Sequence, residues 1–284
     1  MTQFSMHKYF LPMAMLFLSA CSDQAATNSQ NNPSNSPSTA NNEVNAKAND
    51  FVSKLPANAP TLQVVTSRST APYSFSDAYG NQQGFDIDLI HAVGKKAGFK
   101  VELISATPNE VLASVAKGKY PIGIGGHTYS KERENAYALS KPYTYSPSAM
   151  LFDPNINING LSDVKHLKVG VLNASTQIHD LKAIGKTDYI VVDTPYLLYD
   201  GLLKKKYDVA LFSSATFHEI MKNQKKIKMN IRSYESTSNA EAYQVFLMQK
   251  GDIKLKNKID KALTQLKADG TIRKLEKKWV PELS

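Results

Sequence analysis

From Leu62 onward, short apolar runs alternate with longer amphipathic segments, and this alternation restricts the chain to a small number of folds. The runs 62–65 and 101–104 have the length of buried strands. Between them, the segment 86–97 carries apolar side chains at helical spacing. Strands separated by helices in this order predict parallel pairing through crossover helices, which is the α/β class.

The pattern occurs twice and therefore predicts two lobes. For the first lobe we expect strands at 62–65, 101–104 and 121–124, with helices at 86–97 and 109–117. For the second we expect strands at 168–172, 190–192 and 209–212, with helices from about 176, at 195–204 and at 215–223. A strand at 243–248, a helix at 253–268 and a short helix reaching Trp279 follow, with Asp269-Gly270 ending the longer helix.

The first twenty residues have the composition of a secretory signal. Lys8 precedes an apolar run over 9–18, and Ser19-Ala20 supply the small residues of a cleavage site before Cys21. A membrane-spanning helix would need about 20 apolar residues, more than this run provides. We therefore interpret 1–20 as a lipoprotein signal peptide and Cys21 as a lipid attachment site, which predicts export and anchoring to a bacterial membrane, facing the periplasm or the cell exterior.

Cys21 is the only cysteine, so the exported chain has no intramolecular disulfide. The segment 21–59 is rich in Asn, Ser, Ala, Thr and Pro. Such a composition buries little apolar surface, and we expect a disordered tether. The expected domain organisation is then lobe 1 at 60–148, lobe 2 at 149–241 and a return to lobe 1 at 242–284.

The formal net charge is +9, with basic clusters at 204–206, 222–228 and 273–278. No nucleic-acid recognition motif accompanies this charge, and we interpret the clusters as solvated helix faces. His127 has no second histidine at ligand spacing, so it predicts a packed side chain rather than a metal site. We expect no metal and no cofactor.

Four segments together resemble the polar amino acid family of periplasmic solute-binding proteins, known as family 3. They are Gly84-Phe85-Asp86-Ile87-Asp88-Leu89, Thr128-Tyr129-Ser130-Lys131-Glu132-Arg133, Val169-Gly170-Val171-Leu172-Asn173-Ala174-Ser175-Thr176-Gln177 and the run from Lys261 to Thr271. The resemblance extends from about Leu62 to Trp279. It implies a type II periplasmic-binding-protein fold, with two mixed, mainly parallel sheets flanked by helices and joined by two hinge strands near 146–152 and 240–246.

The resemblance also implies a function and a site. Such proteins bind a small solute between the lobes and deliver it to an ABC permease in the inner membrane, and we expect a monomer. Arg133 matches the arginine that takes the ligand's carboxylate, through two parallel hydrogen bonds that its planar fork can form. The other positions expected at the ligand are Thr128, Gly126, Ser175, Thr176, Gln177, Ser213, Arg68 and Tyr73. Gly125-Gly126 would leave backbone groups open to a ligand oxygen.

Two departures from the family pattern concern the ligand's ammonium group. Ser213 stands where amino acid binders have an aspartate, and Ser67-Arg68-Ser69-Thr70 lacks the usual acidic and aromatic residues. A desolvated ammonium without a carboxylate partner costs several kcal/mol. One hypothesis is therefore an acidic ligand without this group, held by Arg68 as well as Arg133. The rival hypothesis is an ordinary amino acid, with a carboxylate supplied by Asp77, Asp193, Glu219 or Glu241.

Two further functions remain open from the sequence. An enzyme of the dehydratase type on the same scaffold would need an acid or base at the cleft, for which His179-Asp180 and His218-Glu219 are the candidates. A sensor or surface lipoprotein that has kept the fold is the other alternative.

Overall fold

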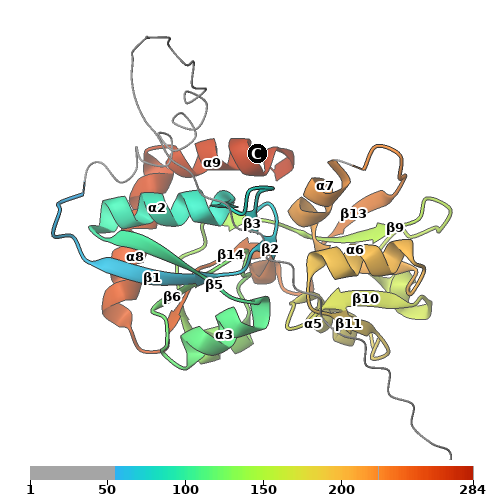
Figure 1. Cartoon of the computed structure of the whole chain (residues 1–284). Helices are drawn as coiled ribbons and strands as arrows, with labels where there is room; N and C mark the ends of the chain where they lie inside the picture. The colour runs from blue at the N-terminus through green and yellow to red at the C-terminus, as the bar shows by residue number, and fades with distance from the viewer. Residues whose placement is uncertain (1–54, 223, 284) are drawn as a thin grey trace, which may run out of the picture. The chain divides into compact units, whose positions relative to one another are not determined.

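The computed structural model describes residues 55–222 and 224–283, which form two lobes, each containing one five-stranded sheet (Figure 1). The predicted signal peptide, Cys21 and the tether as far as residue 54 lie outside the described residues. Within the two described ranges, no helix has both the length and the hydrophobicity needed to cross a membrane.

The first sheet combines parallel and antiparallel strands. Its order is β5 (Lys100–Ser105), β1 (Thr61–Thr66), β6 (Ile122–Ile124), β15 (Leu247–Gln249) and β7 (Tyr137–Leu139). Strand β1 pairs in parallel with β5 and β6, whereas β15 is antiparallel to β6 and β7. Because β15 comes from the last part of the chain, the chain returns to the first sheet after building the second.

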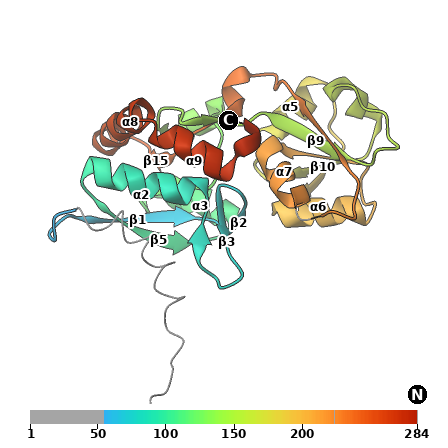
Figure 2. The ribbon, with the colours of Figure 1, turned by 90° about the horizontal axis from the view of Figure 1, so that it is seen from above.

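Helices cover both faces of the first sheet. α2 (Phe85–Ala97), α8 (Ile253–Ala268) and α9 (Thr271–Trp279) pack against one another on one face (Figure 2), and α3 (Pro108–Ala116) lies on the other (Figure 1). α3 begins at a capping box, in which the Thr107 side chain accepts the backbone N–H of Glu110 and the Glu110 side chain accepts the backbone N–H of Thr107.

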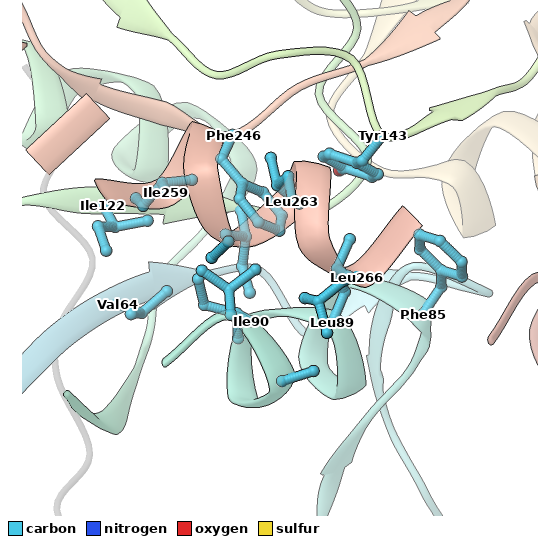
Figure 3. Packing of buried hydrophobic residues seen from close by; sticks show 14 of the residues in the cluster. Val64, Phe85, Leu89, Ile90, Ile122, Tyr143, Phe246, Ile259, Leu263 and Leu266 are labelled. Atoms are coloured by element: carbon cyan, nitrogen blue, oxygen red, sulfur yellow. The ribbon is translucent and has the colours of Figure 1, made fainter. Parts of the chain in front are cut away.

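The larger hydrophobic core of this lobe lies between α2, α8 and the sheet. Figure 3 shows Leu89 and Ile90 of α2 facing Leu263 and Leu266 of α8, with Val64 of β1 beside them. All five side chains are at most 2% exposed. Burial of side chains of this size stabilises a fold by about 1.5–3 kcal/mol each, so this cluster fixes the helices on the sheet.

The second sheet repeats the arrangement. Its order is β11 (Ile190–Val192), β10 (Val169–Leu172), β12 (Val209–Ser213), β9 (Ser148–Phe152) and β13 (Asn230–Tyr234). The first three strands are parallel, and β9 is antiparallel to both β12 and β13. α6 (Pro195–Leu203) and α7 (Ser214–Lys222) share one core with this sheet, and α5 (Gln177–Ala183) and a 3-10 helix (Leu161–His166) share the other.

The two passages of the chain between the sheets pair with each other. β8 (Thr144–Tyr145) and β14 (Tyr243–Gln244) form an antiparallel ribbon. The predicted crossing at 146–152 is wrong in its second part, because β9 already belongs to the second sheet. The predicted strand 243–248 is interrupted: β14 ends at Gln244 and β15 begins at Leu247.

Two short pieces complete the first lobe. A three-stranded antiparallel sheet, β2 (Ser69–Thr70), β3 (Ser74–Ser76) and β4 (Gln82–Gln83), precedes α2. α4 (Lys131–Ala136) follows β6 and leads directly into β7. Both pieces carry residues that the sequence places at the ligand.

Candidate functional site

Arg133 connects the two lobes. It lies in the first turn of α4, where its backbone N–H donates to the capping Ser130 Oγ at 3.1 Å. Its Nη1 donates to the carbonyl oxygen of Thr128 at 2.6 Å and to Thr128 Oγ1 at 2.9 Å, within the first lobe. Its Nη2 donates to the carbonyl oxygen of Ala174 in the second lobe at 3.0 Å. The Nε–H has no acceptor among the described residues, so this edge of the fork can receive a ligand oxygen.

The second lobe meets Arg133 with the loop between β10 and α5. Ala174 has a positive φ of 53°, an uncommon conformation for a residue with a side chain. Thr176 Oγ1 lies 3.3 Å from Thr128 Oγ1, so the two predicted hydroxyls touch across the lobes. Ser175 is 9% exposed, and its Oγ has no partner in the described part of the chain. Gln177 instead donates to Ser148 Oγ at 2.7 Å, a contact within the second lobe.

A cavity of about 300 Å³ lies at this junction. It is lined from the first lobe by Leu112, Ser130, Glu132, Arg133, Ala136 and Tyr137, and from the second by Ala174, Ser175, Thr176, Ile178 and His179. The guanidinium is partly buried, and burial lowers the pKa of Arg133 while neighbouring Tyr137, Glu241 and Glu132 raise it. The guanidinium of an arginine is not deprotonated in proteins, so the cavity has a permanent positive charge on its wall.

Gly126 lies in a turn whose N–H groups are bonded to Asp86. The N–H groups of Gly125 and Gly126 donate to Asp86 Oδ2 at 2.9 and 2.8 Å, so they are not open to a ligand oxygen, contrary to the expectation from the sequence. Gly126 has a φ of +75°, and a Cβ atom on it would lie 2.7 Å from the Tyr73 ring. The glycine is therefore required for backbone conformation and close packing.

Tyr73 and Ser213 form a second meeting point between the lobes. Ser213 Oγ, at the end of β12, lies 2.9 Å from Ser146 Oγ in the crossing segment. Burial raises the pKa of Tyr73, and the nearby Ser146 and Ser213 hydroxyls offset only part of that effect. The Tyr73 phenol has no hydrogen bond of ordinary geometry to any described residue, although the side chain is 1% exposed. An unpartnered buried hydroxyl of this kind is suited to a polar ligand.

Arg68 lies neither at the cavity beside Arg133 nor at the meeting point of Tyr73 and Ser213. It follows β1 in an exposed turn, where its backbone carbonyl accepts the Ser76 N–H. Its guanidinium makes no hydrogen bond or ion pair to the residues that the structure describes. The structure therefore does not support the hypothesis that Arg68 provides a second positive charge for the ligand.

Of the four carboxylates considered as ammonium partners, two lie between the lobes. Asp77 accepts N–H groups from Tyr79 and Asn81 in its own turn. Glu219 pairs with Lys222 on α7. In contrast, Asp193 Oδ1 lies 3.5 Å from Asn109 Nδ2 of the first lobe.

Glu241 is the other carboxylate between the lobes. It is 8% exposed at the return crossing, with Oε1 3.1 Å from His179 Nδ1. Its Oε2 is buried, and no partner for it occurs among the described residues.

Among the histidines and their acidic neighbours, Asp180 lies differently from the sequence interpretation, whereas His127 does not. His127 is a packed histidine, as predicted: burial, together with the charge of Arg133, lowers its pKa to about 3. Asp180 is fully buried rather than solvated, and it accepts hydrogen bonds from Tyr234, Ser236 and Thr237. His179, its neighbour, faces carboxylates on both sides.

Gln244 is a buried residue that sequence reasoning missed. It lies in β14, is 0% exposed and forms a bridge to Thr128, yet neither amide heteroatom has a side-chain partner among the described residues. Its position in the hinge ribbon next to Thr128 was not visible in the sequence, because the register of β14 depends on the crossing segments.

Comparisons with known proteins agree with the two-lobed fold. Residues 62–282 match the family model described as bacterial extracellular solute-binding proteins, family 3. The amino-acid-binding protein AabA of Dichelobacter nodosus is 28% identical over 214 residues, which cover 74% of this chain and 84% of that protein. The putative ABC transporter arginine-binding protein 2 of Escherichia coli K12 is 25% identical over 230 residues, covering 78% of this chain and 91% of that protein. A solved structure of an ancestral arginine-binding protein bound to arginine has a TM-score of 0.70 at 30% identity, covering 78% of this chain and 98% of that chain.

Proposed function

The chain belongs to the bacterial extracellular solute-binding proteins of family 3, and we propose on this premise that it is the substrate receptor of an ATP-driven importer. Its fold is that of type II periplasmic binding proteins, as predicted, with two lobes of mixed sheets flanked by helices. The matched relatives are binding proteins of transporters and not enzymes, in agreement with the prediction of a binding function. The dehydratase alternative is therefore not favoured.

The observation that carries the proposal is the position of Arg133. Its guanidinium donates to both lobes, lines the cavity between them and keeps the Nε–H without an acceptor among the described residues. A carboxylate placed there would accept charge-assisted hydrogen bonds from the fork and would be enclosed by Thr128, Ser175 and Thr176. Binding at this point also explains why a ligand would favour the closed arrangement of the lobes.

We propose that the ligand is an amino acid or a closely related small carboxylate. The names of the relatives, which refer to amino acids and arginine, support this class. Glu241 is the carboxylate best placed to receive an ammonium group, because it is buried beside the arginine and has a free oxygen among the described contacts. The competing hypothesis of a purely acidic ligand has less support, because Arg68 makes no contact toward the site.

The protein's relation to the membrane has two parts, a lipid anchor and a permease. We propose that Cys21 carries a lipid and that a permease receives the ligand from the closed receptor. Cys21 lies outside the described residues, and the sequence before it supports processing and export. Labelling of cells with a radioactive fatty acid, followed by isolation of the wild type and of Cys21→Ser, tests the anchor: only the wild type should be labelled.

The ligand site is tested by calorimetric titration of the purified protein with amino acids, including L-arginine, L-glutamine and L-cystine, and with their deaminated keto acids. We expect an amino acid to bind, and Arg133→Ala to weaken its binding by about 2–5 kcal/mol, because the substitution leaves a desolvated carboxylate unpaired. Arg273→Ala, an exposed arginine on α9, is the matched control and should bind as the wild type does. Equal affinity of Arg133→Ala and wild type would remove Arg133 from the site, and binding of keto acids alone would favour the acidic ligand.

A further inference from the structure

His179 lies between two carboxylates that belong to two other segments of the chain. It is on α5 of the second lobe, and its Nε2 is 2.6 Å from Glu132 Oε2 on α4 of the first lobe. Its Nδ1 is 3.1 Å from Glu241 Oε1, in the 3-10 helix Asn239–Ala242 of the return crossing. The imidazole thus joins the second lobe to the first lobe and to the hinge.

The protonation state of His179 follows from the chemistry of its partners. An ionised carboxylate only accepts hydrogen bonds, so each contact requires an N–H on the ring. A neutral imidazole has one N–H, whereas an imidazolium has two. Both contacts can therefore form together only when His179 is protonated.

The surroundings do not supply a substitute for this proton. On α4 the other charged groups are Arg133, whose guanidinium is engaged with Thr128 and Ala174, and Lys131 and Glu134, which pair with each other. On α5 itself, Asp180 is turned toward 234–237 and Lys182 is exposed. Glu132 is exposed over 72% of its side chain, so the contact that closes the lobes is the one that solvent can replace most easily.

We propose that His179 is a proton-dependent latch that holds the lobes closed over the cavity and so slows release of the ligand. This inference rests on the proposed function, because the latch acts on the same cavity that Arg133 lines. When His179 loses its proton, one of the two carboxylates loses its donor, and the closed arrangement loses a charge-assisted contact. Closure and ligand affinity are therefore greater with the protonated imidazole, which donates to both carboxylates, than with the neutral one, which donates to only one.

Lobe closure can be measured without any ligand. Spin labels at Lys117→Cys, on the first lobe, and Thr187→Cys, on the second, report the distance between the lobes in a Cys21→Ser background; both positions are exposed. We expect the short-distance population to be larger at pH 5 than at pH 8. A distance distribution that does not change with pH would overturn the latch.

Variants separate the latch from other effects of pH. Glu132→Gln removes one carboxylate at an exposed position and leaves the shape unchanged, and His179→Gln removes the titrating group; both should abolish the pH dependence of the distance. His218→Gln, an exposed histidine on α7 of the same lobe, is the matched control and should keep it. The inference is overturned if Glu132→Gln retains the wild-type pH profile, or if His218→Gln loses it.

The effect on binding is measured with L-arginine, or with another amino acid from the titration panel if that one binds. We expect the dissociation rate of the wild type to increase about three- to tenfold between pH 5 and 8, and the rates of both latch variants to stay constant. Failure of every panel member to bind at any pH would count against the proposed function, whereas the spin-label distances would still decide on the latch. Binding with a pH-independent dissociation rate would overturn the latch alone.

Discussion

Asp86 holds the turn on which the predicted ligand residues depend. Its Oδ2 accepts the N–H groups of Gly125 and Gly126, and its Oδ1 accepts the Tyr143 hydroxyl at 2.8 Å. The residue is 0% exposed, and burial raises its pKa to about 6 from an ordinary value of 3.8, although the three donors oppose this shift. The charged form of Asp86 is therefore a cost to folding near neutral pH, in contrast to the usual stabilising role of paired carboxylates.

This cost predicts an unusual dependence of stability on pH. Because the folded-state pKa is raised, the folded protein binds the proton of Asp86 more tightly than the unfolded chain does. The stabilisation by the more tightly bound proton is present below pH 4. It is lost as the pH rises through about 6, which is the pKa of Asp86 in the folded protein. Relative to Asp86→Asn, in which the amide oxygen can accept both glycine N–H groups, the wild type should lose up to about 3 kcal/mol of unfolding free energy between pH 4 and 7. Urea denaturation of both proteins at several pH values measures this, and a difference independent of pH would contradict it.

The residues of the site that one local motif positions are the ones that the sequence can predict. Arg133, Thr128 and the capping Ser130 lie within six residues, so one local motif determines their geometry. The expectation that the Gly126 N–H is open to a ligand is wrong, because its acceptor Asp86 lies 40 residues earlier in the chain, beyond the reach of a local pattern. The contact between His179 and Glu241 spans 62 residues and depends on the path of the return crossing, which no local pattern contains.

At the scale of elements, Tyr207 determines how α6 lies on β10. Its ring is packed between Gly170 of the strand and Gly201 of the helix, and a Cβ atom at either glycine would lie 2.6 Å from ring carbon Cζ. Its hydroxyl donates to the carbonyl oxygen of Leu198 on the same helix. The two glycines thus set the distance between α6 and the sheet.

Gly201→Ala should therefore destabilise the protein despite the higher helix propensity of alanine. The gain from propensity is at most about 1 kcal/mol, and overpacking against a rigid ring costs about 1–3 kcal/mol. Gly160→Ala is the matched control, because a Cβ atom there meets nothing within 4 Å, and its effect should stay within about 0.5 kcal/mol. The midpoints of chemical denaturation compare the two variants, and equal stability would show that Tyr207 can move aside.

Elements with strong local signals were predicted well, and edge elements were not. α3 and α8 begin at capping residues Thr107 and Asp252, and both agree with the predicted helices to within one residue. β13 was missed because its five residues are mostly exposed, so its sequence carries little hydrophobic signal. β7 was missed because it is only three residues long and directly follows α4. Its place in the sheet is decided by pairing with β15, from the far end of the chain.

At the scale of the whole described molecule, each lobe has its own hydrophobic cores, and the contacts between the lobes are mainly polar. One exception is Ala215 of α7, which is buried with the core cluster of the first lobe. The other contacts that join the lobes include the hinge ribbon, the hydrogen bonds of Arg133, the His179–Glu132 and Asn109–Asp193 pairs, and the hydroxyl pairs Thr128–Thr176 and Ser146–Ser213. Closure therefore depends on a few polar groups that a ligand can reinforce.

Ligand binding should accordingly raise the thermal stability of the chain as a whole. An amino acid that binds between the lobes stabilises only the folded, closed state, by about 2.7 kcal/mol at a concentration 100 times its dissociation constant. Scanning calorimetry at increasing ligand concentration should show a steadily rising Tm. In Arg133→Ala the same ligand concentrations should leave Tm nearly unchanged, and an equal rise in both proteins would place the ligand elsewhere.

The ribbon formed by β8 and β14 constrains how such a receptor reports its occupancy. The backbone hydrogen bonds between the two strands hold them together, so both crossing segments move as one unit when the lobes swing about the ribbon. Residues far from the ribbon are then displaced most, so a partner protein would detect closure best at the outer edges of the two lobes. A partner that contacts both outer edges would distinguish the closed protein from the open one without contacting the ligand.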